Sequence, residues 1–169
     1  MRSLLCLLLM TLSGPLFAGC GLFLDVGNPQ AASDPAAHDA FVTVRIFNCL
    51  GATREGNGIP YPRESTTVTA TAEGLLDGRR VSIPLRILKL KIPGLSAVFW
   101  KQPTEGTWLL NFRIAGVGPY SIGNLQTVTG ALVAVRPNGV ERRTQLVHMP
   151  ATALEIDEAL QEIRRTDYP

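Results

Sequence analysis

Cysteine and histidine are the side chains best suited to nucleophilic or metal chemistry, and this sequence holds only three cysteines and two histidines. These numbers exclude a disulfide-stapled scaffold, a four-cysteine zinc site and a three-histidine centre. Cys49 and His148 could act as a thiolate–imidazole pair if the fold brought them together. His148 and Met149 offer ligands that suit copper, but neighbours on a strand point to opposite faces, so they could bind one ion only at a bend such as Pro150. Otherwise we expect Met149 in the core and His148 on the surface.

No recognised catalytic motif is present. The sequence has no Gly-x-Ser-x-Gly nucleophile elbow, no His-Glu-x-x-His zinc motif and no glycine-rich phosphate loop. Gly116-Val117-Gly118-Pro119 lies among predicted strands and cannot supply the strand–turn–helix that a dinucleotide requires. We therefore expect a non-catalytic protein without a cofactor.

Residues 1–19 have the order of an export signal. Met1-Arg2-Ser3 is a short basic start, residues 4–12 are an almost unbroken apolar run, and Ser13-Gly14-Pro15 ends it. The apolar run is shorter than the roughly 18 residues that a transmembrane helix needs. This order predicts export from the cytoplasm.

Three alternatives remain for how the chain is processed at Cys20. Phe17-Ala18-Gly19-Cys20 resembles the bacterial lipobox, in which the cysteine becomes lipidated and N-terminal, although leucine is usual where Phe17 stands. Cleavage after Ala18 would instead leave Cys20 able to form a disulfide with Cys49. An uncleaved segment, extended by residues 22–24, would be a membrane anchor. Lipidation is our main expectation; it leaves Cys49 as a lone thiol.

Residues 20–40 are expected to be a polar linker, because from residue 25 onward the composition shifts to glycine, asparagine, proline, glutamine, serine, aspartate and alanine. Alternation of apolar and polar residues begins at Phe41 and recurs about seven times, at spacings typical of sandwiches. The expected strands lie near residues 42–46, 66–72, 81–87, 95–100, 108–114, 127–136 and 140–148. The expected fold is a mostly β, immunoglobulin-like antiparallel sandwich over residues 41–169.

Several features refine this fold. Asp77-Gly78 and Pro93-Gly94 are turn signals, and Pro84 assigns its strand to a sheet edge or a bulge. Trp100 and Trp108 lie in alternating runs and are expected in the core. The period then changes, because Thr152 and Glu155 form a capping box and apolar residues follow at helical spacing. A helix over residues 152–165 should cover a sheet edge or the open end of the sandwich.

Charge is unevenly distributed along the chain. Residues 41–150 carry thirteen basic and six acidic side chains, whereas residues 151–169 carry two basic and five acidic ones. The helix is therefore expected to dock partly by charge, and a basic face on an exported protein could meet anionic lipid or glycan. The sequence has no basic motif with interleaved aromatic residues, so we expect no nucleic-acid partner.

Part of the chain resembles known exported domains. The residues concerned are Val68-Thr69-Ala70-Thr71-Ala72, Leu76-Asp77-Gly78 and Glu105-Gly106-Thr107-Trp108. They resemble bacterial immunoglobulin-like and carboxypeptidase-regulatory-like (transthyretin-type) repeats, and the small YtkA-like sandwiches, some of which are associated with copper handling. The resemblance spans residues 66–114. It implies a sandwich and transfers no functional residue.

Together these features predict an exported, lipid-anchored binding or structural module of the bacterial cell envelope. A periplasmic copper-handling protein and a soluble secreted sandwich with a Cys20–Cys49 disulfide are the alternatives. The expected partner is an envelope protein or glycan. Loops over residues 48–63 and 116–123 are the expected contact surface, with Tyr61 and Tyr120 as aromatic anchors.

Overall fold

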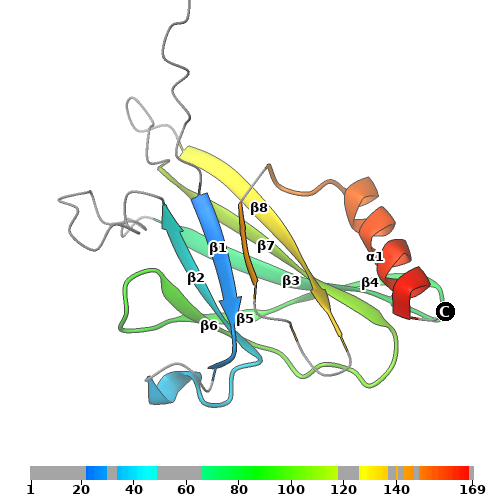
Figure 1. The fold of residues 1–169 in the computed structure, drawn as a ribbon, viewed down its shortest axis with the longest axis horizontal. Helices are drawn as coiled ribbons and strands as arrows, with labels where there is room; N and C mark the ends of the chain where they lie inside the picture. Colours follow the sequence, from blue (N-terminus) through cyan, green and yellow to red (C-terminus); the bar gives the residue numbers. More distant parts are fainter. Residues whose placement is uncertain are drawn as a thin grey trace, which may run out of the picture.

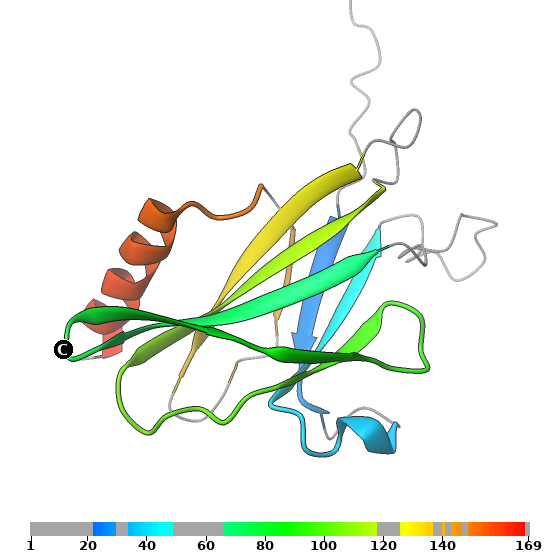
Figure 2. The same ribbon diagram turned by 180° about the vertical axis from the view of Figure 1, so that it is seen from behind.

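The computed structural model describes residues 22–29, 34–48, 66–117, 126–136, 140, 143–146 and 149–167. These residues form two antiparallel sheets packed face to face, with a helix after the last strand (Figures 1 and 2). The five-stranded sheet has the order β5-β6-β2-β1-β9 and the four-stranded sheet the order β4-β3-β7-β8. The strands are β1 (Leu22–Gly27), β2 (Val42–Asn48), β3 (Thr67–Leu76), β4 (Arg79–Pro84), β5 (Arg86–Lys89), β6 (Leu95–Phe99), β7 (Thr107–Val117), β8 (Gln126–Val135) and β9 (Arg143–Leu146).

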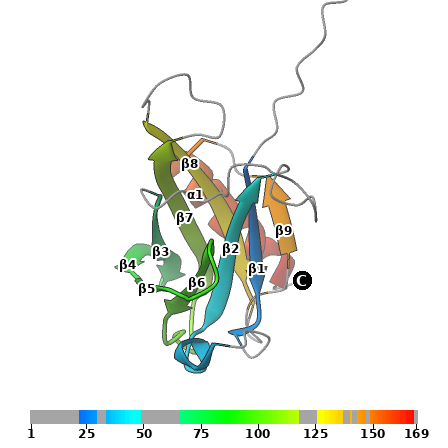
Figure 3. The same ribbon diagram turned by 90° about the vertical axis from the view of Figure 1, so that its left-hand side faces the viewer.

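The predicted mostly β sandwich with a C-terminal helix is confirmed. The described residues form nine strands rather than about seven. One extra strand is β1, and the other arises because the strand expected over residues 81–87 is divided into β4 and β5. Figure 3 shows the two sheets side by side, with β3 and β7 in one and β1 and β2 in the other.

The core lies between the sheets and follows from alternation along the strands. In β7 every second side chain from Trp108 to Ile114 is buried against the five-stranded sheet. Trp108 also donates from its indole nitrogen to the carbonyl oxygen of Glu105 at 2.8 Å, which satisfies its one polar atom. Trp100 packs edge-on against Trp108, with ring centroids 5.4 Å apart. Both tryptophans are thus core residues, as predicted.

The segment expected to be a linker contains a core strand. β1 lies between β2 and β9, and Leu22, Leu24 and Val26 are buried between the sheets. The prediction of a linker over residues 20–40 is therefore wrong for β1. The error arose because Asp25 and Gly27, which alternate with the buried residues on the other face, gave the segment a polar composition.

Pro84 marks a change of sheet. β4 is an edge strand of the four-stranded sheet, as its proline predicts, and it ends at Pro84. The next amide, that of Leu85, donates to the carbonyl oxygen of Ala70 on β3 at 2.9 Å. The chain then crosses into β5, at the edge of the other sheet. At the other end of β4, Asp77 and Gly78 adopt positive φ angles of 51° and 73°, so the predicted hairpin turn is confirmed.

The C-terminal helix α1 (Ala153–Asp167) begins at the predicted capping box. The Thr152 amide donates to the Glu155 carboxylate at 2.7 Å, and the Glu155 amide donates to the Thr152 hydroxyl at 3.3 Å. Ile156 and Leu160 are buried against Leu109 of β7. Leu109 lies on the opposite face of β7 from the sandwich core, so α1 covers the outer face of the four-stranded sheet (Figure 1). The expectation that the helix would cover an edge or an open end is therefore wrong.

Candidate functional site

The predicted contact loops and the chain's N-terminal segment adjoin the same end of the sandwich. In the registers, Leu22 pairs with Asn48, Phe23 with Leu146, and Val117 with Gln126. The start of β3 lies at this end as well, because Thr67 pairs with Ala115 near the end of β7. We call this the N-terminal end. The strand ends that flank residues 49–65 and 118–125 are therefore grouped around the start of β1.

Several predicted site residues cannot be placed. The export signal, Cys20, Cys49, Tyr61, Tyr120 and His148 lie outside the described residues. Four expectations therefore stay predictions: lipidation of Cys20, the Cys20–Cys49 disulfide, the Cys49–His148 pair, and the contact role of Tyr61 and Tyr120. Of the helices in the described part of the chain, none has the length and apolar character needed to cross a bilayer.

A pocket of about 300 Å³ lies between the two sheets near the N-terminal end. Its lining is mostly apolar and includes Ile46 from β2, Val68 from β3 and Leu95 from β6. The Lys89 ammonium reaches across it from β5 and donates to the carbonyl oxygen of Thr66 at 3.0 Å. The pocket thus combines an apolar wall with one cation, an arrangement suited to an amphipathic ligand rather than to acid–base chemistry.

The turn between β5 and β6 forms one rim of this pocket and carries an unusual set of exposed side chains. Leu88 is 40% exposed and Ile92 41% exposed, and Lys89 and Lys91 are exposed between them. We call these four residues the β5–β6 tip. The turn is closed by hydrogen bonds from Leu90 to Leu95 at 2.9 Å and from Leu95 to Ile92 at 3.0 Å, so the tip is a structured hairpin.

Asp34 fastens this tip to the rest of the sandwich. Its carboxylate accepts from the Ala36 amide at 3.1 Å, capping the short 3₁₀ helix η2 (Pro35–Ala37), and from the Lys91 amide at 3.2 Å. These two hydrogen bonds, with the nearby Lys91 charge, hold the pKa of Asp34 below its usual value against the opposing effect of desolvation. The pKa of Asp34 is thus lowered by its structural role, which is to cap η2 and to hold the β5–β6 tip.

The outer face of the five-stranded sheet carries an aromatic pair at the N-terminal end. Phe23 of β1 and Phe47 of β2 stack with ring centroids 5.5 Å apart. Both are half-buried, and the two residues face each other in the register. Farther along the same sheet, the Arg86 guanidinium lies 3.7 Å from the centre of the Phe99 ring.

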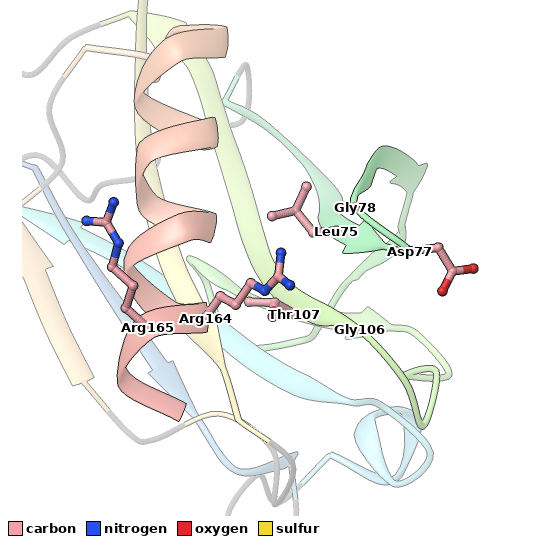
Figure 4. A pocket seen from close by; sticks show the side chains of 7 residues that line it. All are labelled: Leu75, Asp77, Gly78, Gly106, Thr107, Arg164 and Arg165. Carbon is pink, nitrogen blue, oxygen red and sulfur yellow. The ribbon is translucent and has the colours of Figure 1, made fainter. Parts of the chain in front are cut away.

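Another pocket, of about 640 Å³, lies between the end of α1 and two turns of the four-stranded sheet. The Arg164 side chain extends toward Thr107, whereas the Asp77 side chain points away from both residues (Figure 4). Arg164, Arg165 and Asp77 are all exposed, and Arg165 lies 3.9 Å from Glu162 on the helix surface. These side chains are solvated, so we assign no site to this pocket.

The predicted metal residues are only partly described. Met149 is 84% exposed beside the start of α1, so the expectation that it belongs to the core is wrong. Pro150 breaks the chain just before the capping box, which places Met149 on a connection rather than in a strand. Among the described residues, no cluster of three or more histidine, cysteine, aspartate or glutamate side chains could hold a metal ion.

Sequence reasoning missed the β5–β6 tip, although the signal was present. Residues 88–92 alternate leucine or isoleucine with lysine, and Pro93-Gly94 was recognised as a turn. A Leu–Lys alternation is typical of a half-buried edge strand, and the exposure of its apolar members follows only from the position of β5 at the sheet edge. Comparisons with protein-family models, curated proteins and solved structures found no match for this chain.

Proposed function

We propose that this protein is an exported, lipid-anchored β-sandwich of the bacterial cell envelope that acts by binding rather than by catalysis. The observation that carries the proposal is the position of β1. Its first residue, Leu22, follows Cys20 by two positions and is buried in the core. A lipid on Cys20 would hold the folded domain directly at a membrane, without an intervening linker.

The charge of the sandwich surface supports an anionic partner. All nine described arginine and lysine residues between 42 and 136 are exposed. The exposed carboxylates in the same described stretch are those of Asp77 and Glu105. Such an excess of cations attracts anionic lipid headgroups, acidic glycans or acidic protein surfaces.

The perturbed carboxylates support binding over catalysis. Asp34 and Glu155 are the described groups with clearly lowered pKa values, and each accepts hydrogen bonds that cap a helix. The pKa of Glu155 falls because the amide and then the hydroxyl of Thr152 donate to its carboxylate. Shifted pKa values at an active site serve proton transfer, whereas these two serve local structure.

Fractionation of the native host tests the anchor. The wild-type chain should sediment with the membranes and require detergent for extraction, whereas Cys20→Ser should be released into the soluble fraction or retain its signal segment. Equal partitioning of the two chains, with no acyl mass on the wild-type chain, would contradict lipid anchoring.

The predicted contact surface needs a separate experiment. Tyr61→Ala and Tyr120→Ala should weaken capture of the chain's partner from an envelope extract, and Tyr168→Ala, which changes the remaining tyrosine, is the control. Capture that survives both loop substitutions would show that these loops are not the contact surface.

A soluble, disulfide-linked domain is the second candidate, because the pairing of β1 with β2 brings the segments that carry the two cysteines to the same end of the sandwich. Leu22 pairs with Asn48, and paired residues in antiparallel strands have Cα atoms about 5 Å apart. In the sequence, Cys20 and Cys49 are two and one residues from this pair, outside the described residues. Lipidation of Cys20 leaves its thiol unavailable, so the two candidates exclude each other.

A further inference from the structure

The pocket of about 300 Å³ between the two sheets has its polar side chains gathered at one place. Lys89 of β5 pairs with Ser96 of β6 in the register, and the Lys89 ammonium donates to the carbonyl oxygen of Thr66 at 3.0 Å. All three residues line the pocket. An ammonium has three N–H donors, and no carboxylate of the described residues lies within ion-pair distance of this one. The pocket therefore carries a positive charge that no described carboxylate balances.

Thr66 supplies a hydroxyl without a partner at the same place. The residue is 2% exposed, and its Oγ1 atom makes no hydrogen bond. Thr66 extends the alternation of Val68 and Ala70, which pack in the core, so its side chain points between the sheets. On β7 it meets Gly116, where a Cβ atom would lie 3.1 Å from the hydroxyl oxygen. Buried hydroxyls are nearly always hydrogen-bonded, so an unpaired one that lines a pocket indicates a ligand that supplies the missing partner.

The rest of the lining is mostly apolar. Ile46 is buried, Val68 and Leu95 are half-buried, and the exposed Ile92 and Pro93 lie where the pocket meets solvent. At about 30 Å³ per water molecule, the pocket has room for about ten waters, or for about ten ligand atoms other than hydrogen. It therefore suits a small ligand with an apolar chain and one charged end.

We propose that this pocket binds a medium-chain carboxylate, an alkyl chain of about eight carbon atoms that ends in one negative charge. The carboxylate accepts from the Lys89 ammonium and from the Thr66 hydroxyl, which gives that hydroxyl the partner it lacks. The alkyl chain packs against Ile46, Val68 and Leu95. One cation balances one negative charge, so a monoanion fits better than a phosphate dianion, whose second charge would be left without a partner. The proposal goes beyond the envelope-binding function and is independent of the lipid anchor.

Titration with octanoate, followed by methyl NMR, tests this site. The full chain is labelled with ¹³C in its isoleucine, leucine and valine methyl groups. It is purified in digitonin, a detergent too bulky for a pocket of this volume. The methyl resonances of Ile46 and Leu95 should shift and saturate, whereas those of Leu160, which packs under α1, should not move. At equal free concentration, acetate, which lacks the alkyl chain, and 1-octanol, which lacks the charge, should bind at least about 10-fold more weakly.

A matched pair of lysine variants tests the charged end of the pocket. Lys89→Met removes the charge-assisted hydrogen bond to the ligand and should weaken octanoate binding by about 10-fold or more. Lys91→Met removes the same charge two residues away, from a side chain that does not line the pocket, and should leave binding unchanged. Equal weakening by the two variants would show that Lys89 does not contact the ligand.

Thr66→Val separates the ligand contact from an effect on the fold. Valine keeps the shape of threonine and removes the buried hydroxyl that has no partner, so the melting temperature without ligand should rise. Octanoate binding should nevertheless weaken about 5-fold, because one hydrogen bond to the carboxylate is lost. A variant that only damaged the pocket would lower both the melting temperature and the affinity.

The outcomes separate this inference from the proposed function. Unchanged Ile46 and Leu95 resonances at high octanoate concentration would overturn the site, as would equal binding of 1-octanol. Tighter binding of octyl phosphate would overturn the monoanion as the ligand class. None of these results bears on the anchor, which the intact mass of the chain decides. A chain that carries no lipid and binds octanoate through Lys89 would support this site and overturn the anchor alone.

Discussion

The guanidinium of Arg80, on the edge strand β4, forms an ion pair of 3.0 Å with Asp157 of α1. The same group donates to the carbonyl oxygen of Ala153 at 3.1 Å and lies 3.5 Å from the buried carboxylate of Glu73 on β3. Glu73 also accepts from the hydroxyls of Thr71 and Ser82. One arginine therefore links a buried carboxylate of the sheet to the first turn of the helix, and the predicted docking by charge is confirmed at this contact.

Removing this arginine should loosen the helix. Arg80→Met leaves the Glu73 carboxylate buried without its cation. We expect the free energy of unfolding to fall by about 2 kcal/mol, which is the usual contribution of a hydrogen bond to a charged group. The ion pair with Asp157 adds little, because both side chains are partly exposed to solvent. Arg79→Met, at the exposed neighbouring position, should change stability by less than about 0.5 kcal/mol. Urea denaturation compares the two, and equal losses would contradict this role of Arg80.

The apolar contact of the helix has its own test. Leu160 is fully buried between α1 and β7, so Leu160→Ala should destabilise the protein by about 2–5 kcal/mol through the lost burial and the cavity left behind. Leu154, on the same helix, is 66% exposed and provides the matched control. Leu154→Ala should have almost no effect in a thermal melt. Comparable shifts in melting temperature would mean that α1 does not pack as described.

Gly74 provides a prediction about the core. It faces Trp108 in the register of β3 and β7, and a Cβ atom there would lie 2.5 Å from Cζ3 of the indole ring. Because the ring is held by the core on its other side, Gly74→Ala should cost about 1–3 kcal/mol and alter tryptophan emission. Gly27→Ala, whose Cβ would meet its nearest atom, Thr43 Oγ1, at an ordinary 3.6 Å, should leave the emission unchanged. An unaltered spectrum for Gly74→Ala would refute the close approach.

The lowered pKa of Asp34 gives a pH dependence of defined sign. The folded state binds this proton less tightly than the unfolded chain, so the stabilisation is fully present above the ordinary aspartate pKa, about 3.9. It is lost as the pH falls through the lower folded-state value. Asp34→Asn should therefore destabilise the protein at pH 7, and the difference from wild type should shrink as the pH falls below about 4.

Urea titrations between pH 7 and pH 3 measure this difference, with Asp39→Asn as a control at an exposed position of the same segment. Hydrogen exchange at the Lys91 amide provides a local readout, because that amide donates to Asp34. A difference that stays constant over this pH range would contradict the assigned cause.

The sequence was most informative where a pattern had one physical meaning. The strand alternation in β7, the Asp77-Gly78 turn and the capping box at Thr152 each require a particular backbone, and the structure contains all three. The burial of Leu109 was not foreseen, because alternation reports one buried face and the helix covers the other. β1 was missed because its three buried residues follow an apolar signal segment and precede a run of turn-forming residues.

The candidate site was harder to predict than the fold. β1 pairs with β2, and this pairing brings the start of β1 to the strand ends that flank residues 49–65 and 118–125. No local sequence pattern specifies that pairing. The approach of Lys91 to Asp34 likewise joins residues far apart in the chain. Such contacts are set by strand order rather than by spacing.

Intact mass spectrometry of the mature protein, recovered in detergent from the native host's envelope, tests the central claim most directly. The account predicts a chain that begins at Cys20 and carries the added mass of its acyl groups. An unmodified chain that begins at Gly19 and is lighter by two hydrogens would contradict it, because that mass means a Cys20–Cys49 disulfide and a domain without a lipid anchor.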